Sequence, residues 1–490
     1  MKITTLLTAL LFLLVAQLPA LLFLLVAQLP AQLFLLVAQL PAQLRLPSII
    51  ASDMVLQQQS DAHLWGWSGP GEKVYVTASW NHKTDSVMTS RDARWIITLP
   101  TPEAGGPYTI TIKSGQTIEL KNIMIGEVWV CSGQSNMEMS STWGIPQVSA
   151  AFADCANNNI RFFQVPKTGA LFPQDDVKGG WAVCDSNSLR SFSAVGYFFG
   201  RKLNGQLHVP VGMIGSNWGG TSAEVWTPET AVAGNDQLRH AAERLNPTDW
   251  WPYTLGACYN GMIAPIVSFE IAGVIWYQGE SNVETSGTYQ QIFTTMIESW
   301  RRAWNKDLPF YYVQIAPYNY GPGYAAASLR EQQTRTQSHH NVGMVVTTDL
   351  VDNVADIHPK LKKEVGDRLA NFALAQTYGQ QAAVYRSPQY KRMDIVKDKI
   401  NLYFDHAPGG LFIKGDTARE IFIAGEDRKF LPATVKIEKD FITVSAKGVA
   451  NPVAVRFGFG NNAMGNLFGK EGLPVIPFRT DEWPLDSVVP

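Results

Sequence analysis

The feature that most constrains the fold is a change in hydrophobic pattern at Glu127. From there, unbroken apolar runs alternate with segments that have the period of amphipathic helices, such as 194–203 and 289–304. Strands buried on both faces read as continuous apolar runs, and parallel strands are joined by helical crossovers. The pattern therefore predicts an α/β domain built on a parallel sheet. Its expected strands are Val128–Cys131, Val211–Gly215, Ile271–Tyr277, Phe310–Ile315 and Val342–Thr348.

The segments on either side of this domain have the pattern of β structure. Between Leu46 and Ile123, short strand-like segments are separated by turns such as Gly-Pro-Gly at 69–71, which is typical of a small β-sandwich. The strand-and-turn pattern returns from about Ile395. We predict an N-terminal β-sandwich region at 43–123, the α/β domain at 124–390 and a C-terminal β region at 391–490. Whether the C-terminal strands complete the sandwich or pack beside the α/β domain stays open at this point.

Residues 1–42 contain a tandem repeat of eleven residues. Lys2 precedes an apolar stretch, and three copies each end in Val-Ala-Gln-Leu-Pro-Ala. A positive start followed by an apolar run and a small residue is typical of a secretory signal. Gln and Pro interrupt the stretch in every copy, so it lacks the unbroken run of about 20 apolar residues that suits a membrane span. We expect a signal peptide cleaved between Ala20 and Ala42, and a mature protein that is periplasmic, bound to the cell surface or secreted.

Composition narrows the classes of partner and cofactor. The chain has 40 basic and 42 acidic residues and no basic run, which does not favour nucleic acid or anionic membranes as partners. The four cysteines lack the close pairs of a zinc site, and we expect no metal and no other cofactor. Cys155 and Cys184 flank a loop and are a candidate disulfide pair in an oxidising compartment.

Polar loops follow four of the five predicted strands. In an open parallel sheet the carboxyl ends of the strands meet at one edge, and active sites lie there. Three serines in these loops occur in the pattern Gly-x-Ser and are candidate nucleophiles: Ser135, Ser222 and Ser281. None has glycine two residues later, so the Gly-x-Ser-x-Gly elbow of α/β-hydrolases is absent. A serine nucleophile also needs a base, an orienting acid and donors for the oxyanion.

His358 is the best candidate base among the eight histidines. It lies in an acidic loop between the last predicted strand of the sheet and the helix that follows Pro359. Asp356 is two residues earlier, and an extended backbone places both side chains on one side. Asp349 and Asp352 remain alternative acids.

Several blocks of this sequence resemble the sialate O-acetylesterase family, which belongs to the SGNH or GDSL-like hydrolases. The resemblance runs in order along nearly all of the chain after residue 42. It rests on Gly-Gln-Ser-Asn-Met at 133–137, Trp-Gly-Gly-Thr at 218–221, Trp-Tyr-Gln-Gly-Glu-Ser-Asn at 276–282 and Asp-Ile-His-Pro at 356–359, with further matches at 52–57, 259–263 and 477–481.

The resemblance implies a flavodoxin-like sheet of order 2-1-3-4-5 and a role for each matched residue. Ser135 would be the nucleophile and His358 the base. The backbone N–H of Ser135, a backbone N–H at Gly219 or Gly220 and the Gln278 amide would form the oxyanion hole. Asn136, Trp218 and Glu280 are weaker candidates for substrate contacts. The superfamily places its acid three residues before the histidine, which here is Ala355, so Asp356 is the nearest substitute.

The resulting hypothesis is a serine esterase that removes O-acetyl groups from sialic acids or related acetylated glycans. One alternative is an acetyl esterase for plant polysaccharides such as xylan or xyloglucan. The other is a carbohydrate-binding protein without activity. The presence of Ser135, Gln278 and His358 argues against this second alternative.

Overall fold

The computed structural model describes residues 43–381 and 384–485, so the predicted signal at 1–42 lies outside the described residues. Five parallel strands form the centre of the molecule in the order β10-β7-β11-β12-β13, which is the expected 2-1-3-4-5. One further parallel strand and an antiparallel edge strand extend the sheet beyond β10. The strands are β7 (Gln116–Gly133), β8 (Asn157–Gln164), β9 (Trp181–Cys184), β10 (Val211–Asn217), β11 (Gly273–Tyr277), β12 (Phe310–Val313) and β13 (Val342–Val345).

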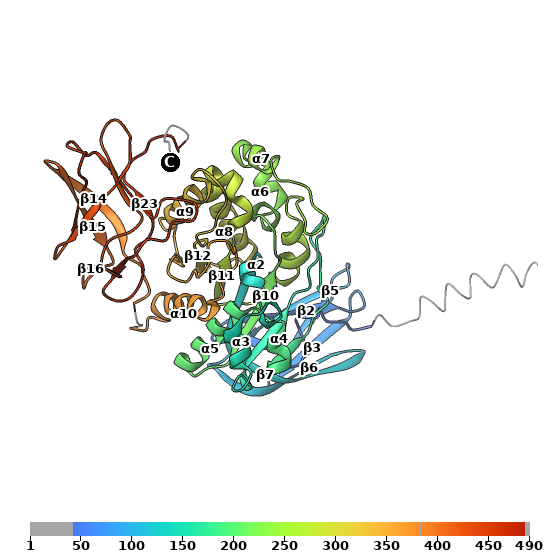
Figure 1. Cartoon of the computed structure of the whole chain (residues 1–490). Coiled ribbons are helices and arrows are strands. Elements are labelled where there is room, and N and C mark those ends of the chain that lie inside the picture. The colour runs from blue at the N-terminus through green and yellow to red at the C-terminus, as the bar shows by residue number, and fades with distance from the viewer. Residues whose placement is uncertain (1–42, 382–383, 486–490) are drawn as a thin grey trace, which may run out of the picture.

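Helices cover both faces of this sheet (Figure 1). Along β7, Val128 and Val130 point into the core that α8 and α9 share, whereas Trp129 and Cys131 point into the core beneath α5 and α10. Both faces are therefore buried, which explains the unbroken apolar runs. The four helices are α5 (Ala194–Leu207), α8 (Tyr289–Trp304), α9 (Ala325–Thr336) and α10 (Lys362–Phe372). Shorter helices are α2 (Ser135–Glu138), α3 (Pro146–Ala151), α4 (Ser186–Arg190), α6 (Glu229–Ala233) and α7 (Asp236–Ala242).

The helix α10 begins later than the sequence indicated. Pro359 lies three residues before its first residue, Lys362. Leu361, which the helical pattern placed on the apolar face, is 39% exposed, while Val365 and Leu369 are buried as expected. The reason is that residues 356–361 belong to the loop that carries His358.

The N-terminal strands form the expected sandwich. One layer contains β1 (Val55–Gln57), β3 (Lys73–Ala78), β4 (Thr84–Met88), β6 (Gly105–Ser114) and the first half of β7, and the other pairs β2 (Asp61–Trp67) with β5 (Arg94–Pro100). Leu64, Val76 and Trp95 are among the side chains buried between them. Because β7 continues from this sandwich into the central sheet, the predicted boundary at 123/124 falls inside a strand.

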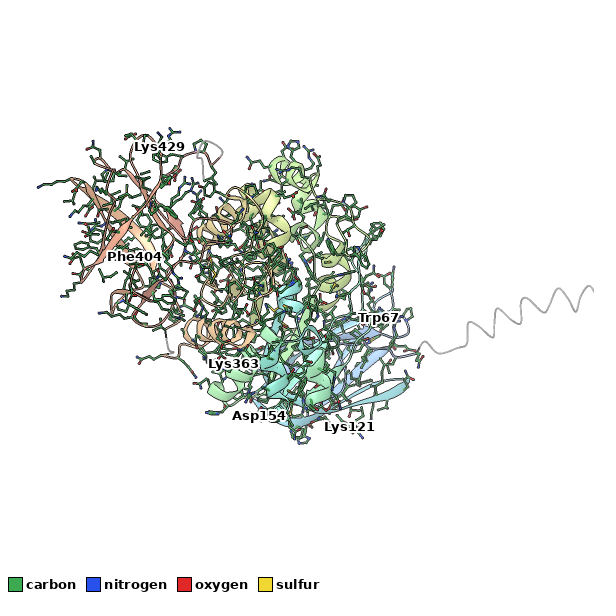
Figure 2. All side chains as sticks on the ribbon, viewed as in Figure 1. Trp67, Lys121, Asp154, Lys363, Phe404 and Lys429 are labelled. Atoms are coloured by element: carbon green, nitrogen blue, oxygen red, sulfur yellow. The ribbon has the colours of Figure 1, made fainter. Side chains whose placement is uncertain are left out.

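The C-terminal strands form a separate unit with a core of its own. It packs beside the α/β domain, away from the N-terminal sandwich, which answers the question left open by the sequence (Figure 1). Arg330 of α9 donates to the carbonyl of Gly460, and Glu331 is paired with Arg479. In Figure 2 Phe404 marks this unit and Trp67 the distant sandwich. Its strands are β14 (Gln389–Val396), β15 (Lys399–Asp405), β16 (Leu411–Ile413), β17 (Ile421–Ala424), β18 (Leu431–Pro432), β19 (Thr434–Ile437), β20 (Ile442–Ser445), β21 (Ala454–Phe457), β22 (Leu467–Gly469) and β23 (Phe478–Arg479).

The candidate disulfide is not formed in this structure. Cys155 and Cys184 are both buried thiols, and the Cys184 thiol donates to the Cys155 carbonyl at 3.1 Å. Separately, within residues 43–381 and 384–485, no helix has both the length and the apolar character needed to cross a bilayer.

Candidate active site

Ser135 lies at a tight turn where β7 ends and the short helix α2 begins. The turn requires glycine at 133, since its φ is +134° and a Cβ there would come within 2.2 Å of the Tyr277 carbonyl oxygen. The backbone N–H of Gln134 donates to the same carbonyl at 3.0 Å. The nucleophile block is thus fastened to the end of the neighbouring strand β11, and Ser135 faces the carboxyl edge of the sheet.

The structure brings Ser135 and His358 into direct contact. The Nε2 of His358 lies 3.0 Å from the Ser135 Oγ, although 223 residues separate the two in sequence. Burial lowers the pKa of His358, and the nearby Lys362 ammonium lowers it further. The imidazole is therefore neutral at neutral pH, the state in which a base can accept the serine proton.

Of the three candidate acids, Asp356 is placed beside His358. Its Oδ1 accepts the backbone N–H of His358 at 2.9 Å and lies 3.7 Å from the ring Nδ1. Although partial burial pulls the Asp356 pKa upward, this backbone N–H and the Lys360 ammonium hold it below its usual range. Asp349 instead forms a two-point ion pair with Arg368, at 2.6 and 2.8 Å, and Asp352 is exposed.

Two backbone N–H groups adjoin the Ser135 hydroxyl. In the described part of the chain, the Ser135 N–H has no acceptor within hydrogen-bonding distance. The Gly219 N–H donates to the Glu138 Oε2 at 2.6 Å, and Lys167 holds the other oxygen of that carboxylate at 2.6 Å. Since a Cβ on Gly219 would lie 3.3 Å from the Ser135 Cβ, this N–H is close to the nucleophile. Glu138 therefore occupies an N–H group that the resemblance offers as an oxyanion donor.

We expect Glu138→Gln to raise kcat/KM for a chromogenic acetate ester about fivefold. A hydrogen bond to a charged group is stronger than a neutral one by about 1 kcal/mol, so the substrate displaces an amide from Gly219 more easily than a carboxylate. Steady-state kinetics test this, with Glu364→Gln on α10 as a control of the same chemistry away from the groove. A lower kcat/KM for Glu138→Gln would instead mean that Glu138 assists turnover.

The Gln278 amide is already hydrogen-bonded to other protein groups in this structure. Its side chain is fully buried, and its Nε2 donates to the Thr221 carbonyl at 3.2 Å and to the Asn282 Oδ1 at 2.8 Å. Its Oε1 accepts the Tyr289 hydroxyl at 2.9 Å. This differs from the expectation drawn from the resemblance. The amide of Gln278 instead fastens the loop after β10 to the loop after β11.

Asn136 and Glu280 form a buried network that joins the loops of Ser135 and His358. The Asn136 Nδ2 donates to the Glu280 Oε1 at 2.6 Å and to the Ile357 carbonyl at 3.1 Å. Its Oδ1 accepts from Lys362 at 2.5 Å, and burial lowers the pKa of that lysine to about 7. Asn136 is fully buried and therefore positions the site instead of contacting substrate, unlike the expectation from the resemblance.

Tryptophan side chains surround the nucleophile. A groove of about 420 Å³ contains Ser135 and His358, and Trp143, Trp218, Trp250 and Trp251 line it. Trp250 is 81% exposed, and the ring of Trp143 packs edge-on against His358 at 5.7 Å between ring centres. Trp251 packs on Gly220, where a Cβ would lie 2.3 Å from the indole. Exposed indole faces of this kind can stack on sugar rings.

Trp218 and Glu280, which the resemblance offered as substrate contacts, do line the groove, but other groove residues were not predicted. Glu138, Lys167 and the loop bearing Trp250 and Trp251 were not identified. Two adjacent tryptophans within an otherwise polar loop were a usable signal, because exposed aromatic pairs mark binding surfaces. No such signal pointed to Lys167, whose role depends on a contact made across 29 residues of sequence.

This fold and this site are those of an ester hydrolase whose candidate nucleophile, Ser135, lies at the edge of a flavodoxin-like sheet. Residues 125–375, just over half of the chain, match the family described as carbohydrate esterase, sialic acid-specific acetylesterase. The chain belongs to this family of carbohydrate esterases.

Individual relatives agree with that placement. The sialate O-acetylesterase of Mus musculus is 28% identical over 427 residues, covering 74% of this chain and 79% of its own length. The Homo sapiens protein of the same name is 28% identical over 400 residues, covering 72% and 75%. A crystal structure of a carbohydrate acetylesterase from Xanthomonas citri is 35% identical, with a TM-score of 0.81, and covers 90% of this chain and all of that one.

Proposed function

We propose that this protein removes O-acetyl groups from sialic acids by acyl transfer to Ser135. The observation that carries the proposal is the 3.0 Å contact between the Ser135 Oγ and the His358 Nε2 at the base of a tryptophan-lined groove. The family supplies the substrate class, since relatives that match most of the chain are named sialate O-acetylesterases.

The geometry supports a two-step reaction. His358 accepts the Ser135 proton as the hydroxyl oxygen attacks the acetyl carbonyl, and the N–H groups of Ser135 and Gly219 stabilise the oxyanion once Glu138 is displaced. His358 then protonates the departing sugar oxygen, which leaves an acetyl-serine. Water, deprotonated by His358, attacks this ester, and the imidazolium then protonates the Ser135 oxygen as its bond to the acetyl carbon breaks and acetate leaves.

A second candidate substrate is an acetylated plant polysaccharide such as xylan or xyloglucan. One observation favours it: exposed tryptophans near Ser135 suit stacking on neutral sugar rings.

Acetate release from a substrate panel tests the proposal. The panel contains O-acetylated sialic acid, acetylated xylan, acetylated xyloglucan and 4-nitrophenyl acetate. We expect hydrolysis of the chromogenic ester and the highest kcat/KM among the glycans for the sialic acid. A higher kcat/KM for xylan or xyloglucan would favour the second candidate. No acetate from any of the four would leave the carbohydrate-binding alternative and overturn the proposal.

We also infer export of the mature protein. The repeated segment at 1–42, with Lys2 before an apolar stretch, supports a cleaved signal. N-terminal sequencing of the protein from its native host tests this, and an intact Met1 would contradict it.

A further inference from the structure

A second pocket adjoins the catalytic groove, and nothing in the acyl-transfer chemistry uses it. Its volume is about 380 Å³, which is within the range of small-molecule sites. The pocket and the groove share Gly220, Trp251, Glu280 and Ser281 along their walls. A substrate whose acetyl group lies at Ser135 can therefore extend into this pocket without leaving the protein surface.

Two buried polar atoms in its wall lack partners within the described residues. They are the Glu280 Oε2 and the Tyr320 hydroxyl. Glu280 is only 8% exposed, and its other oxygen, Oε1, is bonded to Asn136. Buried polar atoms are nearly always hydrogen-bonded, so an orphaned pair marks a place for a missing partner.

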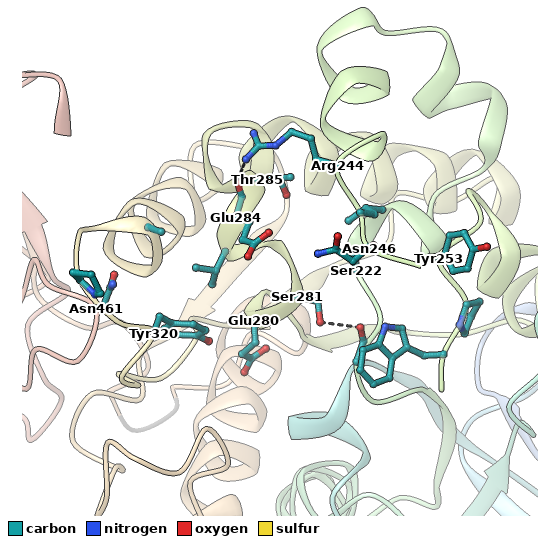
Figure 3. Close-up of a pocket in the computed structure, with 17 residues that line it drawn as sticks. Ser222, Arg244, Asn246, Tyr253, Glu280, Ser281, Glu284, Thr285, Tyr320 and Asn461 are labelled. Carbon is teal, nitrogen blue, oxygen red and sulfur yellow. Dashed lines mark hydrogen bonds between the residues drawn. The ribbon is translucent and has the colours of Figure 1, made fainter. Parts of the chain in front are cut away.

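The two atoms are close to each other and complementary. Figure 3 shows Tyr320 and Glu280 side by side at one end of the pocket, and the charge of Glu280 acts on the Tyr320 hydroxyl. Burial raises the pKa of Tyr320 far above its usual range, so its hydroxyl keeps its proton and can donate. Burial raises the pKa of Glu280, while the Asn136 amide and the Lys362 ammonium favour its carboxylate form, in which Oε2 is an acceptor. Each of the two atoms has less than 1 Å² of accessible surface, so a hydroxyl group that donates to Glu280 and accepts from Tyr320 requires a shift of the side chains around them.

The opposite end of the pocket has a different character. There the Arg244 guanidinium donates to the Glu284 carbonyl at 2.7 Å (Figure 3). Glu280 also lines the groove that contains Ser135, so the orphaned acceptor lies where the pocket and the groove meet. A group bound there belongs to the part of the substrate nearest the ester.

We propose that this pocket is the binding site for the sugar portion of the substrate, in which Glu280 and Tyr320 together bind a free hydroxyl close to the acetylated one. The inference rests on the proposed function and narrows its substrate class to acetyl esters of polyols that keep a free hydroxyl near the ester. A simple aryl acetate fills the groove at Ser135 and leaves the pocket empty.

Tyr320→Phe tests the site because it removes one oxygen and keeps the ring. We expect the ratio of kcat/KM for O-acetylated sialic acid to kcat/KM for 4-nitrophenyl acetate to fall about tenfold, the effect of one lost hydrogen bond of about 1.4 kcal/mol. Tyr318→Phe is the matched control. Tyr318 packs edge-on against Tyr320 at 4.8 Å but lies outside the pocket lining, so its ratio stays at the wild-type value.

A binding measurement gives a second readout that does not depend on turnover. In a Ser135→Ala background, we expect Tyr320→Phe to raise the Kd for the same acetylated sialic acid about tenfold by calorimetry. Glu280→Gln, which keeps an oxygen for Asn136 but replaces the free acceptor with a donor, should also lower the kinetic ratio.

Two outcomes would overturn the inference. One is an unchanged ratio in Tyr320→Phe, which would mean that the orphaned atoms bind only water. The other is an equal loss on both esters, which would mean a structural role for Tyr320. Wild-type protein that cleaves 4-nitrophenyl acetate but no acetylated sugar would contradict the proposed function itself, a result that the wild-type panel reveals before any variant is made.

Discussion

Ser135→Ala is expected to lower acetate release by at least about 10⁴-fold while the protein stays folded. The Ser135 Oγ is the atom that His358 contacts at 3.0 Å, and removing it leaves no group to form the acyl-enzyme. In serine hydrolases, loss of the nucleophile costs about 10⁶ in turnover, and the remaining rate comes from binding and the oxyanion donors. The measurement is kcat for 4-nitrophenyl acetate, together with labelling by a fluorophosphonate probe, which should disappear.

Two other serines provide the comparison for this variant. Ser222→Ala should keep turnover and labelling near the wild-type value, because its side chain makes no hydrogen bond within the described residues. The Ser281 hydroxyl donates to the Gly220 carbonyl at 2.9 Å and so is engaged away from His358. Probe labelling on Ser281 in the wild-type protein would contradict the assignment of Ser135.

Asp356→Asn is expected to lower kcat about 10³-fold. An orienting acid holds the imidazole tautomer and stabilises the imidazolium, and its replacement by Asn in a serine protease costs about 10⁴. The 3.7 Å between the Asp356 Oδ1 and the His358 Nδ1 is longer than a hydrogen bond, and such contacts often shorten when substrate binds. We expect a loss of about 10³ and not 10⁴ because the Asp356 carboxylate also accepts a hydrogen bond from the His358 backbone N–H.

The other two carboxylates should respond differently. Asp352→Asn changes an exposed side chain and should leave kcat unchanged. Asp349→Asn breaks the ion pair with Arg368, so we expect a lower Tm with kcat per folded molecule largely kept. If kcat falls strongly in Asp349→Asn or Asp352→Asn while Asp356→Asn keeps normal turnover, the orienting acid is that other aspartate and not Asp356. Full activity in all three variants would indicate a Ser–His dyad.

Sequence alone predicted the main features of the fold. Each of the five apolar runs became a parallel strand, and the predicted helix at 289–304 has those bounds in the structure. These elements depend on local periodicity and on burial of both sheet faces, which a hydrophobic pattern records directly. The same reasoning placed Ser135 and His358 at one edge, because the carboxyl ends of parallel strands meet there.

The boundaries between regions were less accessible to sequence reasoning. The strand β7 crosses the predicted boundary at 123/124, and only the tertiary structure places the C-terminal strands against α9 and not in the N-terminal sandwich. A strand pattern specifies which face is apolar, but it does not identify the surface that covers that face.

The roles of individual polar side chains were decided by the tertiary structure. Gln278 has the donor that an oxyanion needs, yet both N–H groups of its amide are taken, one by Asn282 of the same loop and one by Thr221 of the loop after β10. Which of the three nearby aspartates can serve as the acid depends on Arg368. This arginine lies on α10, 19 residues after Asp349, and its guanidinium is bonded to the Asp349 carboxylate. Glu138 occupies the Gly219 N–H across 81 residues. A hydrogen bond depends on distances of a few tenths of an ångström between segments that sequence separates, so residue types can indicate which groups are available while only the folded chain determines which are free.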